Sequence, residues 1–241
     1  MSARSITRAA VAAALAGLLT ACSPDAVPTT TADDAAVPGL APTLDSSVGS
    51  ADEPAPLAAG SYTIPFIGAS DDAPWAEIDV PEGWGHDRLH PATGPDLDPH
   101  LRRIELFTVS RVAADPCRSS TDRIGPGVDD LMTALATQRT VRPEQPRAVS
   151  IGGHDGQQIH VRVPLDLDVT RCQLGGLVPL TLPGGAQATV FPGWSYRVRA
   201  LDVAGERLVI LAAQGPQVSA AERAELATMV ETLRFVAAPT I

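Results

Sequence analysis

Residues 196–214, with the sequence YRVRALDVAGERLVILAAQ, form the stretch that decides the predicted fold. Two runs rich in aliphatic and β-branched residues, 196–203 and 207–214, lie on either side of Gly205. Runs of this length and composition are typical of β-strands, and glycine accepts the backbone angles of a tight turn. The stretch therefore predicts a β-hairpin.

A helix is predicted directly after this hairpin. Ser219 and Glu222 have the spacing of a capping box, in which each side chain bonds to the backbone N–H of the other residue. Four apolar residues then recur with the helical period and would form one buried face: Leu226, Met229, Val230 and Leu233. The helix is expected to end near residue 233, and residues 234–236 to add a short strand.

More strands and a second helix are predicted on the N-terminal side of the hairpin. Apolar residues at positions 128, 131, 132 and 135 follow the helical period after a Gly-Pro-Gly break. Strands are expected at 62–67, 75–80, 103–113, 148–151 and 157–163. Antiparallel runs of strands with two inserted helices indicate one α+β domain over residues 61–241, with an antiparallel sheet flanked by helices.

Residues 174–194 are interpreted as one long apolar loop, because glycine and proline recur throughout them. A loop of this length often forms a lip over a ligand pocket or a contact surface for a partner. We therefore take Phe191, Trp194 and Tyr196, together with Trp84, as candidate binding residues. The alternatives are a loop folded over the core with Trp194 buried, and a Trp84 that anchors the core.

Two cysteines, Cys117 and Cys172, remain besides the one near the N-terminus. Two thiols in an exported domain usually pair, so we predict a disulfide between them. A redox dithiol or a metal-binding pair is the alternative, and the wide separation of the cysteines in the sequence argues against both.

The N-terminal segment predicts export and acylation. Arg4 and Arg8 precede a short apolar run that is too short to span a membrane, as in a signal peptide. Residues 19–22, Leu-Thr-Ala-Cys, resemble the lipobox of bacterial lipoproteins. The resemblance implies cleavage after residue 21 and a lipidated Cys22, which would anchor the protein at the extracytoplasmic face of the cell membrane. An ordinary signal peptide with a chance cysteine is the alternative.

Residues 22–60 are predicted to be the lipidated N-terminus and a disordered linker, because they lack aromatic residues and any apolar period. The formal net charge of the chain is −10. Charge of this sign argues against nucleic acid as a partner and against electrostatic attraction to anionic lipids. The lipid anchor is then the expected contact with the membrane.

No catalytic or cofactor motif is found in the sequence, and we predict no cofactor and no metal. His86, His90 and His100 share a loop with aspartates, but its prolines and glycines argue against a helical metal site. Asp166 and Asp168 are close in sequence, yet an acid pair for hydrolysis requires a cleft that sequence does not reveal.

Five short segments of the domain carry a family resemblance. Two of them are Val80-Pro81-Glu82-Gly83-Trp84 after a strand and Thr232-Leu233-Arg234-Phe235 at the end of the last helix. The others are Asp115-Pro116-Cys117, Val128-Asp129-Asp130-Leu131 and Gly205-Glu206-Arg207-Leu208-Val209-Ile210. The first two segments resemble PsbP-like domains, a family that includes lipoproteins of actinobacteria, and the other three resemble a set of secreted actinobacterial proteins. The resemblance implies a sheet flanked by helices and an accessory or binding role, and it assigns no functional residue.

These observations predict a monomeric, non-enzymatic lipoprotein of the cell envelope. Its partner is expected to be an envelope protein or an apolar or envelope ligand. There are two alternatives. One is an envelope enzyme of unrecognised type, with or without the assistance of a metal, and the other is a structural or spacer lipoprotein.

Overall fold

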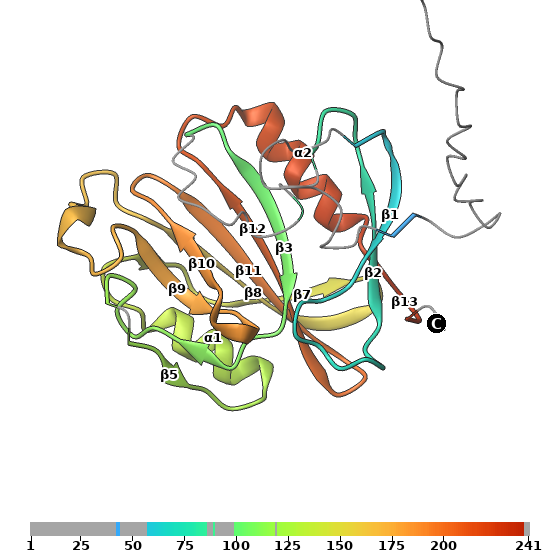
Figure 1. Cartoon of the computed structure of the whole chain (residues 1–241), viewed down its shortest axis with the longest axis horizontal. Helices are drawn as coiled ribbons and strands as arrows, with labels where there is room; N and C mark the ends of the chain where they lie inside the picture. The colour runs from blue at the N-terminus through green and yellow to red at the C-terminus, as the bar shows by residue number, and fades with distance from the viewer. Residues whose placement is uncertain (1–41, 44–56, 86–88, 90–98, 119, 239–241) are drawn as a thin grey trace, which may run out of the picture. The chain divides into compact units, whose positions relative to one another are not determined.

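The protein is described by a computed structural model over residues 42–43, 57–85, 89, 99–118 and 120–238 (Figure 1). These residues belong to one unit of the chain, 37–241. The predicted signal peptide, Cys22 and most of the predicted linker lie outside the described residues. Within the described ranges, no helix is long and apolar enough to cross a membrane.

A large antiparallel sheet forms the centre of the described unit (Figure 1). Its strands follow the order β3-β12-β11-β8-β6, and β7 pairs with β8 beside β6. The bounds are β3 Arg102–Phe107, β6 Arg142–Pro143, β7 Arg147–Ile151, β8 His154–Arg162, β11 Ser195–Val203 and β12 Glu206–Gln214. The predicted hairpin of residues 196–214 is therefore confirmed as β11 and β12, at the middle of this sheet.

Two smaller antiparallel sheets and two helices cover the large sheet. One small sheet has the order β1-β2-β13, with β1 Gly60–Ile64, β2 Trp75–Val80 and β13 Arg234–Val236. The other has the order β10-β9-β4-β5, with β4 Arg111–Val112, β5 Asp122–Arg123, β9 Leu177–Thr181 and β10 Gln187–Val190. The helices are α1 Val128–Ala136 and α2 Ala220–Glu231, and short 3-10 turns occupy Val169–Arg171 and Pro183–Gly185. The predicted α+β class, rich in antiparallel sheet, is confirmed.

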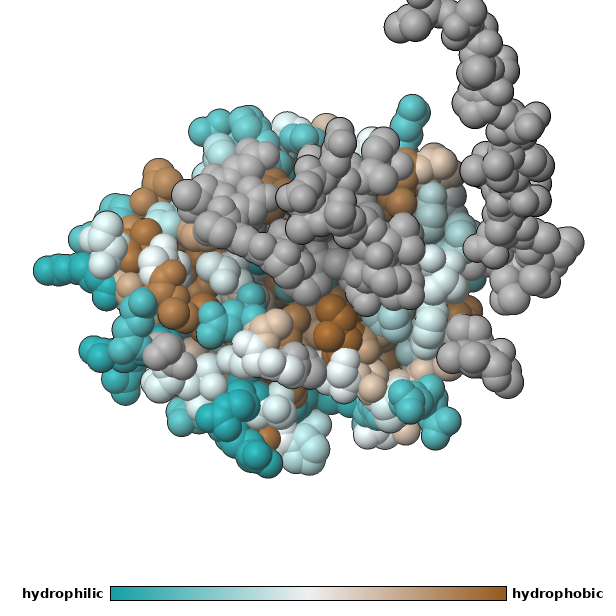
Figure 2. Space-filling view, viewed as in Figure 1, coloured by the Kyte–Doolittle hydropathy of each residue, from teal (hydrophilic) through white to brown (hydrophobic). Residues whose placement is uncertain are grey.

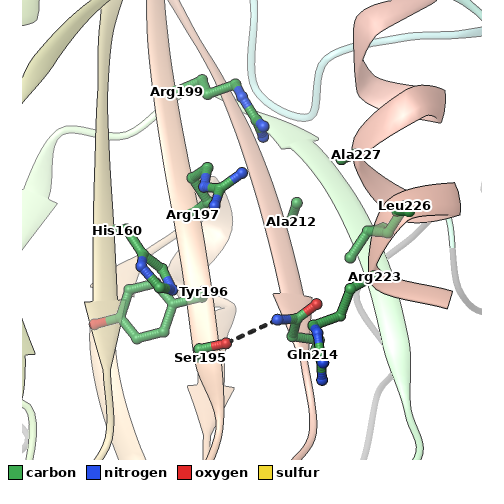
Figure 3. A pocket seen from close by; sticks show the side chains of 11 residues that line it. His160, Ser195, Tyr196, Arg197, Arg199, Ala212, Gln214, Arg223, Leu226 and Ala227 are labelled. Carbon is green, nitrogen blue, oxygen red and sulfur yellow. Dashed lines mark hydrogen bonds between the residues drawn. The ribbon is translucent and has the colours of Figure 1, made fainter. Parts of the chain in front are cut away.

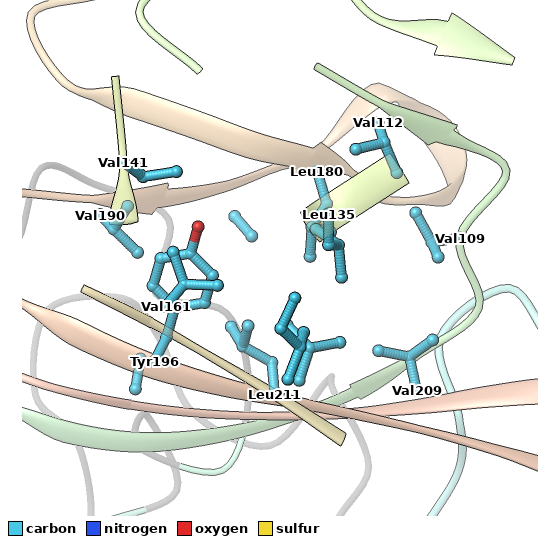
Figure 4. Packing of buried hydrophobic residues seen from close by; sticks show 14 of the residues in the cluster. Val109, Val112, Leu135, Val141, Val161, Leu180, Val190, Tyr196, Val209 and Leu211 are labelled. Carbon is cyan, nitrogen blue, oxygen red and sulfur yellow. The ribbon is translucent and has the colours of Figure 1, made fainter. Parts of the chain in front are cut away.

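The two faces of the large sheet support two separate hydrophobic cores, because side chains alternate between faces along a strand. Tyr196, Val198 and Ala200 of β11 enter the core that also holds α1, β4, β9 and β10 (Figure 4). Leu201 and Val203 of the same strand face the opposite core, which holds β1, β2 and α2. The strand β11 therefore contributes to both cores.

Helix α2 has the start and the buried face that the sequence predicts. The Ser219 hydroxyl accepts a hydrogen bond from the Glu222 N–H at 3.2 Å, and the Glu222 carboxylate accepts one from the Ser219 N–H at 2.8 Å. The four predicted apolar residues are all buried, three of them in α2 and Leu233 just beyond its end. Because the capping box satisfies backbone donors at the first turn, it stabilises the helix by about 1 kcal/mol.

The interpretation of residues 174–194 as a loop is wrong. They contain the strands β9 and β10, which pair with each other around the Pro-Gly-Gly turn. Pro179 lies where the register between the two strands shifts, so its missing N–H costs no ladder hydrogen bond there. The apolar residues of this hairpin pack onto the first core, and so they need no external partner to be buried.

The predicted strand 103–113 is also corrected. The chain leaves the large sheet at Phe107 and joins a small sheet only at Arg111, so two strands replace one. Among the described residues before position 61, the Leu57 N–H donates to the Trp84 carbonyl at 2.8 Å.

Candidate functional site

A cleft of about 320 Å³ lies between α2 and the large sheet (Figure 3). The sheet contributes residues from β8, β11 and β12, and α2 forms the opposite wall. The lining residues are His160, Ser195, Tyr196, Arg197, Arg199, Ala212, Gln214, Arg223, Ala224, Leu226 and Ala227. The cleft is therefore lined by several cationic or polar groups and a few small apolar ones.

Strand β11 places two arginines side by side in this cleft. Arg197 and Arg199 are two residues apart, so they lie on the same face of the strand, opposite Tyr196 and Val198. Arg197 pairs with Ala212 of β12 and with His160 of β8. The small side chain of Ala212 leaves room for the guanidinium groups, which point toward α2 in Figure 3.

Arg199 is the most unusual residue of the cleft. Its relative exposure is only 5%, and its buried Nη1 has no hydrogen-bond partner in the described structure. Burial, and to a lesser extent the nearby Arg197, lower the pKa of Arg199 to about 10, while Glu231 opposes the shift. The guanidinium still carries its charge at pH 7, so an unsatisfied cation lies in the cleft wall at a cost in stability.

The other two arginines of the cleft also lack an acidic partner. Arg197 forms no hydrogen bond or ion pair with any described residue. Arg223, at the exposed surface of α2, donates from Nη1 to the Val218 carbonyl at 2.5 Å, and no carboxylate of the described chain forms an ion pair with it. In a chain with a net charge of −10, these three arginines, none of which forms an ion pair with a described carboxylate, form a local positive centre around the cleft.

His160 connects the cleft to a carboxylate on its sheet side. Its Nδ1 lies 3.1 Å from Oε1 of Glu144. Hydrogen bonding from His160 holds the pKa of Glu144 below its usual value, so this carboxylate is ionised and only accepts. The Nδ1 atom therefore carries the proton. Burial keeps the pKa of His160 below its usual value despite the raising effect of Glu144, so the ring is neutral at pH 7.

Ser195 is oriented by Gln214 instead of by this histidine. The Gln214 Nε2 donates to the Ser195 Oγ at 3.0 Å, as the dashed line in Figure 3 shows. No hydrogen bond joins Ser195 to His160 in the described part of the chain. The serine hydroxyl is thus available as a donor to a ligand, and the arrangement does not activate it as a nucleophile.

The four aromatic residues predicted to bind a ligand are all buried. Trp84 lies in the core beneath α2, where its Nε1 donates to Glu225 at 2.8 Å. Phe191 and Trp194 pack edge to face in the other core, with ring centroids 5.8 Å apart. Tyr196 is buried there too and is the one member of the four that borders the cleft. Their role in binding stays a prediction, and this conformation exposes none of their rings.

The molecular surface offers little alternative for an apolar partner. In Figure 2, apolar residues on the viewed face lie in small groups between polar ones. Leu165 and Leu174 are the large apolar side chains that are exposed in the described residues. Scattered apolar residues of this kind are normal for a protein surface.

The predicted disulfide between Cys117 and Cys172 is confirmed, with Cα atoms 4.5 Å apart. It joins the segment between β4 and β5 to the segment before β9, and neither cysteine lines the cleft. The bonded sulfurs leave no redox dithiol and no thiolate ligand in this state.

The other candidates for chemistry do not converge. His86 and His90 lie outside the described residues, and no group of three or more His, Cys, Asp or Glu that could hold a metal occurs within the described ranges. Asp168 accepts hydrogen bonds from the backbone and hydroxyl of Thr170, which lowers its pKa. That aspartate therefore caps a 3-10 turn, as its bonds show.

Sequence reasoning missed Arg197 and Arg199, although a signal was present. Charged residues alternate with apolar ones over 196–199, and Leu201 and Val203 continue the charged face as buried apolar positions. The change from arginine to leucine along this face indicates cover at positions 201 and 203, but it does not distinguish a covered strand from a solvent-facing one at positions 197 and 199. Comparison of the chain with protein-family models and with curated proteins finds no match, so its own residues carry the interpretation of the cleft.

Proposed function

We propose that this protein is a non-enzymatic lipoprotein of the cell envelope that binds a small anionic ligand between α2 and the large sheet. Acylation of Cys22 would hold it at the extracytoplasmic face of the membrane, and the domain would be PsbP-like. The lipobox-like residues 19–22 support the anchor, and the short motifs around Trp84 and Phe235 support the family. An antiparallel sheet with two helices is compatible with that family.

One observation carries the proposed binding activity. Arg199 is almost fully buried, charged at pH 7 and unsatisfied at Nη1, and it shares the cleft with two more arginines that form no ion pair with a described carboxylate. Groups held in such an unfavourable environment are concentrated at functional sites. An anion in the cleft would supply a negative charge and a hydrogen-bond acceptor for the buried Arg199 guanidinium. The unfavourable burial of this group would then be offset in the complex, which favours binding.

Thermal unfolding of the purified full-length protein tests this function. Anions such as phosphate, sulfate and succinate, compared with chloride at equal ionic strength, are expected to raise the melting temperature, because a ligand that binds only the folded state stabilises it. Arg199→Met should abolish this response. Arg171→Gln removes the same charge from an exposed residue outside the cleft and should respond like the parent protein.

The unliganded variants give a second, independent signal. Because Arg199→Met removes a buried, unsatisfied cation, this variant should be about 1 kcal/mol more stable than the parent in the absence of ligand. A gain of stability together with a loss of the anion response is the signature of a binding residue. Equal anion responses in Arg199→Met and Arg171→Gln would contradict the proposed function.

The anchor is tested separately in cells. Labelled palmitate should be incorporated into the parent protein and should be absent from Cys22→Ala, which would then be found outside the membrane fraction. Incorporation into both proteins would place the lipid elsewhere and contradict the anchor without affecting the cleft.

A further inference from the structure

The geometry points to a phosphate monoester carried by a small organic group as the ligand of the cleft formed by Arg197, Arg199 and Arg223. This inference rests on the proposed anion-binding function and narrows its ligand class. Three properties of the cleft support it, namely the number of charges, the directions of the donors and the space beside them.

The number of charges favours a dianion. Three guanidinium groups line the cleft, and no described carboxylate forms an ion pair with any of them, although Glu231 favours the charged form of Arg199 from further away. A carboxylate or a sulfonate would bring one negative charge and leave most of this positive charge unbalanced. A phosphate monoester carries a charge of about −1.5 to −2 at pH 7, which balances the cleft more closely.

The donors approach from two walls. Arg197 and Arg199 extend from the sheet, whereas Arg223 extends from α2 on the opposite side (Figure 3). The Ser195 hydroxyl adds a donor near the Gln214 end of the cleft. The three terminal oxygens of a phosphoryl group point in different directions and can accept from the neighbouring guanidinium groups of Arg197 and Arg199 at once. The two oxygens of a carboxylate lie in one plane and suit a single guanidinium fork.

The space beside the arginines is larger than a phosphoryl group requires. A volume of about 320 Å³ lies at the lower end of the range for small-molecule sites. Ala212, Leu226 and Ala227 line part of it without charge, and Leu226 is buried. An organic group attached to the phosphate would contact these three residues and so contribute apolar burial.

Matched ligands separate the phosphoryl group from negative charge in general. Phenyl phosphate, benzoate and benzenesulfonate share a phenyl ring and differ in the anionic group. Isothermal titration calorimetry of each compound with the full-length protein, at pH 7.5 and constant ionic strength, compares their affinities. We expect phenyl phosphate to bind at least tenfold more tightly than either monoanion. We also expect it to bind more tightly than inorganic phosphate, which lacks the organic group.

The variants assign the affinity to the cleft. Arg199→Gln and Arg197→Gln should each weaken phenyl phosphate binding at least tenfold, whereas Arg171→Gln should leave it unchanged. Benzoate binding as tight as that of phenyl phosphate, lost in Arg199→Gln, would overturn the phosphoryl assignment and leave the anion cleft intact. Absence of binding by all these anions would overturn both proposals.

The phosphate could belong to a soluble molecule or to a lipid headgroup, and vesicles distinguish the two sources. Full-length Cys22→Ala, which would lack the lipid anchor, is mixed with phosphatidylcholine vesicles that contain or lack phosphatidic acid, a phosphate monoester. Cosedimentation that requires phosphatidic acid and is lost in Arg199→Gln assigns the phosphate to a lipid. Binding of phenyl phosphate without such cosedimentation assigns it to a soluble molecule.

Discussion

Glu105 and Arg103 form an ion pair inside the protein, with Oε1 and Nε 2.9 Å apart and both side chains buried. The two residues lie on the same face of β3, next to the hairpin of β9 and β10. Arg103 also donates from Nη2 to the Thr189 carbonyl at 2.5 Å and lies over the ring of Trp194. Burial raises the pKa of Glu105, and Arg103 opposes that shift.

Removing one member of this pair should be far more damaging than removing both. Glu105→Leu leaves Arg103 buried without a counter-charge and is expected to reduce the free energy of unfolding by about 3–5 kcal/mol. The double variant Glu105→Leu, Arg103→Met replaces both charges by apolar groups and should regain most of that loss. Urea denaturation measures both values. Equal losses in the single and the double variant would show that the pair acts only through packing.

His160 should make the protein less stable at mildly acidic pH. Its folded-state pKa lies below 6.5, because burial outweighs the opposing effect of Glu144, while Arg197 and Arg162 lower it further. Below about pH 6.5 the unfolded chain binds a proton that the folded protein does not, so this contribution to stability is complete at higher pH and declines as the pH falls.

Urea denaturation between pH 7.5 and 5 checks this effect. The stability of His160→Gln should decline less over this range than that of the parent protein. His154→Gln changes a histidine at the β7–β8 turn, outside the cleft, and serves as the control. An identical pH dependence in the parent and in His160→Gln would exclude His160 as a source of the decline.

The disulfide should contribute substantially to stability. It closes a segment with a sequence separation of 55 residues, for which the chain-entropy model gives about 4 kcal/mol. Cys117→Ala, Cys172→Ala is therefore expected to unfold at a clearly lower urea concentration than the parent. The parent in reducing agent should approach the variant, and the variant itself should not respond to the reductant.

Two glycines of one hairpin should differ sharply in their tolerance of alanine. A Cβ at Gly156 would lie 2.1 Å from the Ala200 carbonyl oxygen, so alanine there would force β8 away from β11. A Cβ at Gly153 would meet nothing within 4 Å, and alanine would cost only about 1–2 kcal/mol for its positive φ of 83°. Thermal unfolding should therefore rank Gly156→Ala well below Gly153→Ala.

The elements with strong periodicity could be predicted from the sequence. The hairpin of β11 and β12 has long aliphatic runs around Gly205, and α2 has both a capping box and an apolar face. The pairing of β9 with β10 could not be predicted from the sequence, because Pro179 and the glycines around it are typical of loops. Packing of their apolar residues against the large sheet overrides that local preference.

The cleft was beyond prediction for a different reason. Alternating charge on β11 is equally typical of a solvent-facing strand, and nothing local to Arg199 indicates that α2 covers it. Leu226 and Arg223, which form the opposite wall, are more than twenty residues further along the chain. Tertiary contact alone converts an ordinary strand face into a cationic site.

The alternation of β11 divides its sequence into two independent sets of positions. The side chains of residues 196, 198 and 200 pack into one core, whereas those of residues 195, 197 and 199 lie on the face of the cleft. Substitutions in the second set leave the first untouched, since the side chains lie on opposite faces of the sheet. Relatives of this protein could therefore diversify in what they recognise while inheriting the same scaffold, and a combinatorial library confined to the three odd-numbered positions would explore new specificities at little risk to folding.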